Sequence, residues 1–267
     1  MKKILIILSL FGSLLLVRGV LALDILTGNT NSTALDGINQ SWEIADNQSV
    51  SLGASSTIAM WVNADTPGST VFDFVAKYAA AGDQRAFRFT YQDEAGFRGF
   101  IWGTSSDGVG GASVKTGVWN YTLATTTWTH IAVTNSTAGA CVMYVNGSAI
   151  TISQDQCNTT IFNNTPAFTI GKSISAGPYD GRIDDLRIWK RTLTATEISD
   201  LYTTPCNFTN GDNFSGQWLF DDNGNDDSGQ GNTLTNNNSS TFVTSVGYSC
   251  GGAGGAPPTI GDIIWWE

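Results

Sequence analysis

Charged side chains are scarce in this sequence, and histidine is nearly absent. Only 13% of the 267 residues are charged, against 41% that are hydrophobic, and the chain has a single histidine. Disordered acidic tails and exposed helical bundles carry more charge than this. Gly, Ser, Thr and Asn make up much of the remainder, and these residues suit short strands joined by many turns. The composition therefore predicts an all-β protein.

Several chemical signatures are incomplete. No Cys-x-x-Cys pair or Cys/His cluster offers the ligand spacing of a zinc site. Residues Gly247–Gly251 fit the Gly-x-Ser-x-Gly pattern of a nucleophile elbow, but that motif requires a later histidine. The only histidine, His130, comes earlier in the chain, where a structural role in a strand is expected. Gly110–Thr116 lacks the Gly-Lys pair of a phosphate-binding loop. The sequence thus identifies no catalytic residue.

The N-terminus has the pattern of a secretion signal. Lys2 and Lys3 form a basic start, Ile4–Val17 is a stretch of apolar or small residues, and Val20–Ala22 offers a small-residue cleavage site. The alternative is an uncleaved anchor, which the shortness of the stretch disfavours, because a membrane span needs roughly 20 apolar residues. We expect cleavage, with no membrane insertion afterwards, and a secreted or cell-surface protein.

The charge balance is acidic. The complete chain has 13 cations and 23 acids, and residues 1–22 contain three of the cations and no acid. Cleavage after Ala22 would therefore leave ten cations and a net charge of −13. Such a surface disfavours nucleic acid and anionic membranes, and it is compatible with calcium and with neutral glycans.

Four cysteines in an exported chain predict two disulfide bonds. Cys141 and Cys157 bracket the expected Met143–Ile152 hairpin, whereas Cys206 and Cys250 bracket the C-terminal segment. This pairing is one of the three connectivities that four cysteines allow. We favour it because each bond closes one recognisable unit.

Asn-x-Ser/Thr sequons are frequent, and they would accept glycans in a host with the necessary enzymes. They include Asn31, Asn120, Asn135, Asn146, Asn158, Asn207 and Asn213.

Alternation of apolar and polar residues predicts strands along most of the chain. They are expected at 57–62, 86–91, 97–102, 128–133, 141–145, 150–152, 167–170, 182–189 and 216–220. Asn146-Gly147 is a strong hairpin-turn signal. One short helix is expected after the capping box Thr194–Glu197, with Ile198, Leu201 and Tyr202 at helical spacing. Many strands and one helix predict a two-sheet sandwich.

Three segments share a pattern with a known family, in the same order. They are Thr57–Asn63; Thr127–Val133 with Met143–Gly147; and Phe168–Gly171 with Gly181–Trp189, Arg191–Leu193 and Glu197-Ile198. Together they resemble the laminin-G-like, or concanavalin A-like lectin/glucanase, jelly-roll family over about residues 33–202. The resemblance implies an all-β, antiparallel jelly-roll sandwich with a small C-terminal appendage.

The sequence departs from this family in one respect. Similar domains often begin with a Trp-x-Phe-Asp segment and an Asp-Ser-Ser-Gly loop, which are missing near Leu23. A good match lies instead at Trp218–Asp222 and Asp227–Asn232. Either a second domain begins there, or this segment folds back to complete the first. We divide the chain into a signal peptide (1–22), a jelly-roll domain (23–202), a disulfide-bounded segment (203–250) and a Gly/Pro-rich tail (251–267).

The resemblance also implies a structural calcium ion. Similar proteins hold one at an aspartate that corresponds to Asp184, beside a loop that corresponds to Asp227 and to the turn from Gly229 to Asn232, whose carbonyls would be further ligands. Period-two alternation places Asp184 on the face of Leu186 and Ile188, where an unpaired carboxylate would be costly. The alternative is an aspartate that accepts hydrogen bonds from the backbone or is solvated at a strand end.

Aromatic side chains beside loops are the candidate sugar-binding platforms. We select Trp102, Trp119 and Tyr179 as candidate ligand contacts, although core packing is the more common role of such residues in a sandwich. Trp42, Trp61 and Trp128 are assigned to the core, because most tryptophans of a sandwich pack there.

The expected function is extracellular, non-catalytic recognition or adhesion, through a glycan or an extracellular protein. Glucanases that resemble this family use a Glu-x-Asp-x-x-Glu strand to flank the glycosidic bond, and this chain has none. Two alternatives remain, namely a structural spacer within a larger surface protein and a divergent glycoside hydrolase.

Overall fold

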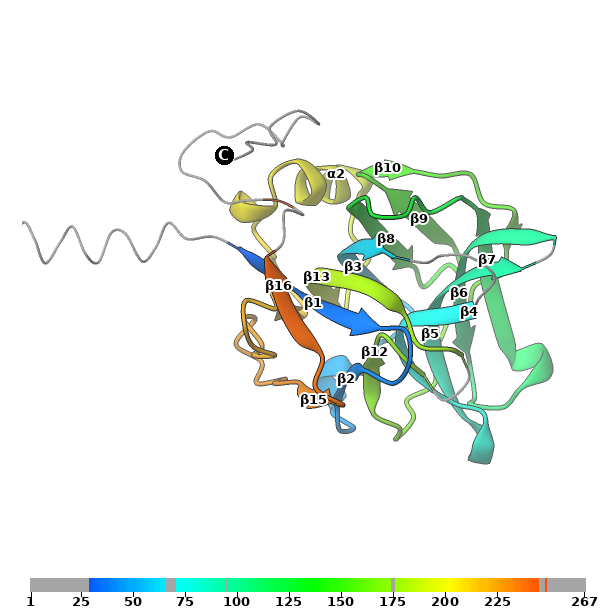
Figure 1. The fold of residues 1–267 in the computed structure, drawn as a ribbon. Coiled ribbons are helices and arrows are strands. Elements are labelled where there is room, and N and C mark those ends of the chain that lie inside the picture. Colours follow the sequence, from blue (N-terminus) through cyan, green and yellow to red (C-terminus); the bar gives the residue numbers. More distant parts are fainter. Residues whose placement is uncertain (1–28, 66–70, 95, 174–175, 245–247, 249–267) are drawn as a thin grey trace, which may run out of the picture.

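The computed structural model describes residues 29–65, 71–94, 96–173, 176–244 and 248. Two antiparallel β-sheets pack against each other, and the α-helix lies on the outer side of one of them (Figure 1). This architecture confirms the predicted antiparallel two-sheet jelly-roll sandwich.

The two sheets have eight strands each. The first sheet runs from edge to edge through β10 (Ser148–Ala149), β9 (Cys141–Val145), β8 (Thr129–Asn135), β3 (Ser56–Ala64), β13 (Asp180–Trp189), β1 (Asn31–Asp36) and β16 (Thr241–Thr244), and β14 (Phe214–Trp218) also pairs with β13. The second sheet runs through β11 (Gln154–Asp155), β7 (Val114–Asn120), β6 (Phe97–Ser105), β5 (Gln84–Glu94), β4 (Val71–Ala79), β12 (Phe168–Ile170), β2 (Ser41–Ile44) and β15 (Thr235–Asn237). The connections between the described elements contain four 3₁₀ turns: η1 (Gln48–Val50), η2 (Ala81–Asp83), η3 (Gly111–Ser113) and η4 (Pro205–Asn207).

The main core lies between the sheets, and period-two alternation builds it. In β5, Phe87, Phe89 and Tyr91 are fully buried, whereas Arg88 between them is partly exposed. Burial of each such ring stabilises the fold by about 1.5–3 kcal/mol. The strongest alternating segments of the sequence thus become the central strands of the sandwich.

The expected helix is α2 (Ala195–Thr203). Thr194 Oγ1 accepts a hydrogen bond from the Glu197 amide at 3.2 Å, and Glu197 accepts one from the Thr194 amide at 2.8 Å. This capping box satisfies amides that the first turn would leave unpaired. Ile198 and Leu201 are buried in a second, smaller core on the outer side of the first sheet.

The segment after α2 folds back onto both sheets. Strand β14 pairs with β13, β15 pairs with β2, and β16 pairs with β1. At its end, Tyr248 is buried against the first sheet, where its hydroxyl donates to Asp185 at 2.8 Å. Residues 203–244 therefore supply strands to the sandwich itself.

A bulge in β13 overturns the face predicted for Asp184. The register with β3 shifts between Asp184 and Arg187, and Asp185 adopts a φ of 42°. The extra residue puts Asp184 opposite Trp61, whose ring contacts His130 on the outer side. Asp184 thus does not share the core face of Leu186, because simple alternation cannot anticipate a bulge.

The bulge also marks a gap between two neighbouring strands. Strand β1 pairs with β13 at residues 180–183, and β14 pairs with the same strand at residues 186–189. Asp184 and Asp185 lie between these two ladders. The start of β1 and the residues after β14 therefore meet beside the two carboxylates.

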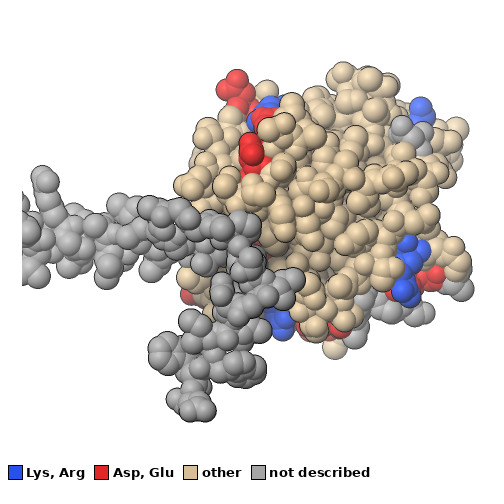
Figure 2. All heavy atoms as spheres, turned by 90° about the horizontal axis from the view of Figure 1, so that it is seen from above, with Lys and Arg blue, Asp and Glu red and all other residues tan. Residues whose placement is uncertain are grey.

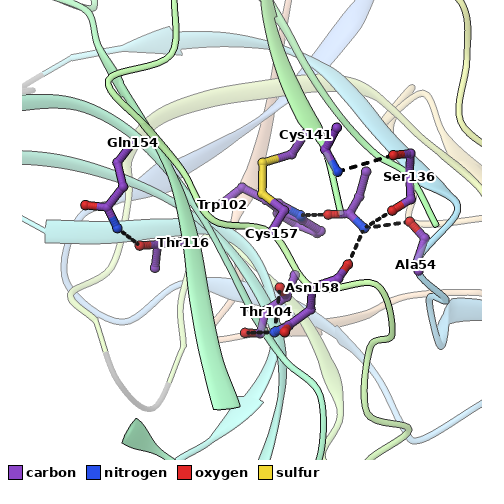
Figure 3. The surroundings of a disulfide bond; sticks show 11 residues. Ala54, Trp102, Thr104, Thr116, Ser136, Cys141, Gln154, Cys157 and Asn158 are labelled. Atoms are coloured by element: carbon purple, nitrogen blue, oxygen red, sulfur yellow. Dashed lines mark hydrogen bonds between the residues drawn. A yellow bond between two sulfur atoms is a disulfide. The ribbon is translucent and has the colours of Figure 1, made fainter. Parts of the chain in front are cut away.

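A disulfide bond joins Cys141 to Cys157, as the sequence predicts, and a network of buried amides surrounds it (Figure 3). Asn135 Nδ2 donates to the Asn158 carbonyl at 3.1 Å, and Asn158 Nδ2 donates to the Thr104 carbonyl at 2.8 Å. Cys206 is disulfide-bonded as well. Cys250, the partner predicted for it, lies outside the described residues, as do the predicted signal peptide and the tail.

A search of the described ranges found no helix with the length and apolarity that a membrane span requires.

Candidate functional site

An open pocket of about 710 Å³ lies at the connection between β5 and β6, beside the end of β7. The lining residues are Asp93, Glu94, Gly96, Phe97, Arg98, Asn120 and Thr122. Two strand ends and the residues after β7 thus contribute one aromatic ring and several polar groups to the same cavity.

Two glycines shape this region. Gly96, in the connection between β5 and β6, has a φ of 101°, a conformation that residues with a Cβ rarely adopt. A Cβ on Gly99 would lie 1.9 Å from the carbonyl oxygen of Trp119. The absence of that side chain lets β7 approach β6, so Asn120 pairs with Gly99 and reaches the pocket.

The charged groups of the pocket differ in their pairing. Asp93 and Arg98 face each other across the hairpin and form an ion pair of 2.8 Å. The hydrogen bond and the charge of Asp93 raise the pKa of Arg98. Glu94 is exposed and accepts a hydrogen bond from the Gln92 amide at 3.2 Å. The pocket therefore offers a paired cation and an exposed carboxylate.

The remaining lining groups suit a ligand with many hydroxyls. The Phe97 ring is partly exposed, and the side chains of Asn120 and Thr122 are exposed. An apolar ring with a few convergent amide, hydroxyl and carboxylate groups can hold an apolar face and orient polar substituents. Asp93 and Glu94 are adjacent in β5, so their side chains point to opposite faces and do not form a facing acid pair.

The three aromatic residues predicted to contact a ligand are core residues. Trp102, Trp119 and Tyr179 are at most 1% exposed. Trp102 Nε1 donates to Asn135 Oδ1 at 3.3 Å, and Tyr179 packs on the rings of β4. No ring face of these three is open to a sugar, so this prediction is wrong.

Two of the three tryptophans that we assigned to the core are buried. Trp42 and Trp61 are buried, whereas Trp128 is only partly buried at the start of β8. Among the described residues, the large hydrophobic side chains that are exposed are Ile38 and Val109, and neither is aromatic. Phe97 therefore matters because its ring is partly exposed within the pocket.

The residues predicted to bind calcium are only partly brought together. Asp184 is buried, and both of its carboxylate oxygens accept a hydrogen bond from Asn29 Nδ2 at 2.9 Å. Burial, reinforced by the negative charge of Asp185, raises the pKa of Asp184 well above its usual range. Asp221, after β14, is close enough to add to that effect.

Asn232 makes several contacts that hold its loop in place. Its side-chain oxygen accepts hydrogen bonds from Asn47 and Ser49, its side-chain amide donates to the Ser215 carbonyl, and its own carbonyl accepts from Trp218 Nε1 at 2.9 Å. These contacts fix the loop after β14 to the sandwich. The calcium ligands predicted for this turn are its main-chain carbonyls and not the Asn232 side chain, so this ligand set stays a prediction.

The other two predicted ligands lie on the same loop. Gly229 is exposed, and Asp227 accepts a hydrogen bond from the Leu219 amide, with a pKa raised by burial and by nearby carboxylates. Across the described residues, no group of three or more His, Cys, Asp or Glu side chains is placed to hold a metal ion. A calcium ion here would depend on amide and main-chain oxygens as well.

Sequence reasoning missed the residues that the fold brings together. Asn29 lies 155 residues from Asp184, and only pairing between β1 and β13 places them in contact. The sequence signal for the pocket was the mixture of acidic and basic residues around the β5–β6 connection, at Asp93, Glu94 and Arg98. No local pattern, however, joins them to Asn120.

The surface in Figure 2 carries few charges. This view shows the molecule from above, where Lys, Arg, Asp and Glu form a few small groups, some with both signs side by side, and most of the visible described atoms belong to uncharged residues. The visible described part of this face has no extended patch of one charge sign, in keeping with the low charged fraction of the sequence.

Structural comparison finds the same fold in proteins of low sequence identity. A candidate carbohydrate-binding protein from Bacteroides ovatus has a TM-score of 0.60 and 16% identity over 81% of this chain. The chain spans 60% of the length of that protein. The native heptameric SAP-like pentraxin from Limulus polyphemus has a TM-score of 0.58 and 12% identity, with 82% of this chain and 96% of the pentraxin covered.

A third similar structure is a carbohydrate-binding domain, CBM40, of a sialidase from Ruminococcus gnavus bound to sialyllactose. It has a TM-score of 0.50 and 13% identity, with 66% of this chain and 99% of that domain covered. At these identities the comparisons establish the fold. No match was found among curated protein sequences.

The comparison with family models is specific. The model described as the concanavalin A-like lectin/glucanases superfamily, of the third laminin G type, matches residues 36–199, which is more than half of the chain. The matched range runs from the end of β1 into α2 and so includes β2 to β13, which supply strands to both sheets, while β14, β15 and β16 lie outside it. This protein therefore belongs to the concanavalin A-like lectin/glucanase superfamily.

Proposed function

We propose that this protein is an extracellular, non-catalytic module that binds a glycan in the pocket between β5, β6 and β7. One observation carries the proposal: the partly exposed Phe97 ring lines the same pocket as carboxylate, amide and hydroxyl groups. Sugars present apolar C–H faces and many hydroxyls, which such a surface can recognise. The family sets the fold, and the pocket supports the ligand class.

The proposed location is outside the cell or at its surface. The Cys141–Cys157 bond supports this, because disulfides persist mainly in oxidising compartments. A formal charge of −10 at pH 7 opposes binding to nucleic acid and to anionic membranes. An extracellular protein is the alternative partner for the same surface.

We also propose a structural calcium ion at the gap in β13. Among the described residues, the side-chain oxygen of Asn29 is buried without a hydrogen-bond partner, and it lies beside the buried carboxylate of Asp184. A cation would be a partner for that oxygen and would offset the negative charge of Asp184, with further oxygens from Asp221 and from the loop of Asp227. Calcium accepts such mixtures of carboxylate, amide and carbonyl ligands. Its effect would be to fix the N-terminal strand to the C-terminal segment.

The experiment for glycan binding is a screen of immobilised oligosaccharides with the purified oxidised protein, followed by titration calorimetry of each hit. Phe97→Ala should weaken binding at least fivefold, because loss of a central ring contact commonly costs more than about 1 kcal/mol. Tyr78→Ala is the matched control, since Tyr78 is also partly buried but does not line the pocket.

Two other outcomes of these experiments would contradict the proposal. If the wild type binds no glycan in the screen, the proposal fails and the spacer function gains support. If a bound oligosaccharide is cleaved over hours, as measured by release of reducing ends, the non-catalytic part of the proposal fails.

A further inference from the structure

We infer that the pocket selects uncharged and amino sugars and excludes acidic ones, and that Glu94 determines this selectivity. This inference rests on the proposed glycan binding and concerns the same cavity. It follows from how the three charged groups of the lining are paired.

The cation of the pocket lies beside a carboxylate. Arg98 donates from Nε to Asp93 Oδ1 at 2.8 Å, and the two residues are directly paired between β5 and β6. Recognition of a sugar carboxylate or sulfate typically uses the planar fork of an arginine. An acidic sugar that approached the half-exposed Arg98 side chain would therefore also meet the negative charge of Asp93, which partly cancels the attraction.

The Glu94 carboxylate gives the lining of the pocket a net negative charge. It is exposed, and among the described residues its contact is with the uncharged amide of Gln92. Asp93 and Arg98 cancel each other, so the net charge of the lining is that of Glu94. The excess of acids in the whole chain adds to the same field.

The consequences differ among sugar classes. Hydroxyls of a neutral sugar can donate hydrogen bonds to the Glu94 carboxylate. The ammonium group of an amino sugar gains an additional Coulomb attraction, whereas a uronate or sialate is repelled. Attraction or repulsion between two unit charges about 4 Å apart in water changes affinity about fivefold. The change is larger where solvent is partly excluded.

The test compares three oligosaccharides of one β-1,4-linked backbone, in neutral, amino and uronate forms, by calorimetry at low ionic strength. The wild type should bind the neutral and amino forms and should bind the uronate at least fivefold more weakly. Glu94→Gln should reduce the preference for the amino form about fivefold. Glu94→Lys should reverse the order of the amino and uronate forms.

Salt and a distant variant provide the controls. Discrimination should decrease as ionic strength rises, because exposed charges are screened. Glu43→Gln, in β2 and outside the pocket, should leave all three affinities unchanged. Tighter binding of the uronate by the wild type would overturn the inference while glycan binding stands. Binding of none of the three classes, here and in the screen, would overturn the proposed function itself.

Discussion

Asn29 donates its side-chain amide to both carboxylate oxygens of Asp184, at 2.9 Å each, across 155 residues of sequence. The contact is made in the gap where β1 and β14 both pair with β13. It ties the start of the described chain to the strand in the middle of the first sheet. Among the described residues, the Asn29 side-chain oxygen beside this carboxylate has no hydrogen-bond partner, and this leads to the first prediction.

Calcium should raise the melting temperature of the wild type, and Asp184→Asn should abolish the rise. A ligand that binds only the folded state stabilises it by about 2.7 kcal/mol at a hundredfold excess over Kd. The measurement is thermal unfolding in EDTA and in millimolar calcium. Equal melting temperatures of the wild type in both solutions would contradict a stabilising calcium site.

In EDTA, Asp184→Asn should also change how the stability of the protein depends on pH. Burial raises the pKa of Asp184 in the folded protein above its unfolded value of 3.8. Ionisation of this group therefore reduces stability as pH rises from about 4 towards the folded pKa. Asp184→Asn should remove this loss, so in EDTA the variant should be at least as stable as the wild type at pH 7.

His130 should make the protein less stable in acid. Burial lowers the pKa of His130 from 6.5 to about 3, beside Trp61 and Tyr202 and near the charges of Asp185 and Arg187. The unfolded chain binds the proton more tightly, so stability falls as pH decreases from 6.5 towards 3, by about 1.4 kcal/mol per unit at most.

Denaturant unfolding between pH 6.5 and 5 measures this slope. His130→Gln should flatten the curve in that interval, whatever its effect on absolute stability. A slope identical to that of the wild type would assign the acid sensitivity to the carboxylates instead.

Tyr248→Phe should destabilise the fold by about 1.5–3 kcal/mol, the range for hydrogen bonds to charged groups. The Tyr248 hydroxyl donates to Asp185, which is also held by a bidentate contact with Arg187 at 2.7 and 2.8 Å. The variant removes one donor from a buried carboxylate without opening a large cavity. Tyr78→Phe, at a partly exposed position, is the control and should change the free energy of unfolding little.

Two sequons should remain unmodified in the folded protein. Asn135 and Asn158 are at most 3% exposed, and their side-chain nitrogens donate to main-chain carbonyls beside the disulfide (Figure 3). A glycan on either nitrogen would break these bonds and could not fit in the core. Asn146 and Asn213 are exposed and should be modified in a glycosylating host.

Peptide mapping by mass spectrometry of the oxidised, folded protein tests the sequons. Occupancy of Asn158 in that material would show that the amide network near the disulfide is not needed for the fold.

Local patterns predicted much of this protein because they reflect local physics. The turn at Asn146-Gly147 follows from its two positive φ angles, 49° and 75°, which these residues tolerate. The helix start at Thr194 follows from a capping box within four residues. The returning strand, by contrast, is Ser148–Ala149 rather than the expected 150–152, because pairing with β9 sets its length.

The prediction for Trp102 failed for a physical reason. Phe100 and Trp102 alternate with Ile101, so both faces of β6 carry apolar residues, and composition does not reveal which face meets the opposite sheet. The structure places Trp102 inside, where its ring contacts Phe87 and Phe89. Phe97, at the strand end, is the ring that lines the pocket.

The sequence by itself determined the family, the strand-rich sandwich and the helix, because each depends on neighbours in the chain or on an ordered set of motifs. It favoured the pairing of Cys141 with Cys157 among three connectivities, and the structure decided it. Only the tertiary structure decided the bulge at Asp185, the contact of Asn29 with Asp184 and the union of Phe97 with Asn120. These features depend on the register between strands that are distant in sequence, and that register is fixed by the packing of both sheets around one core.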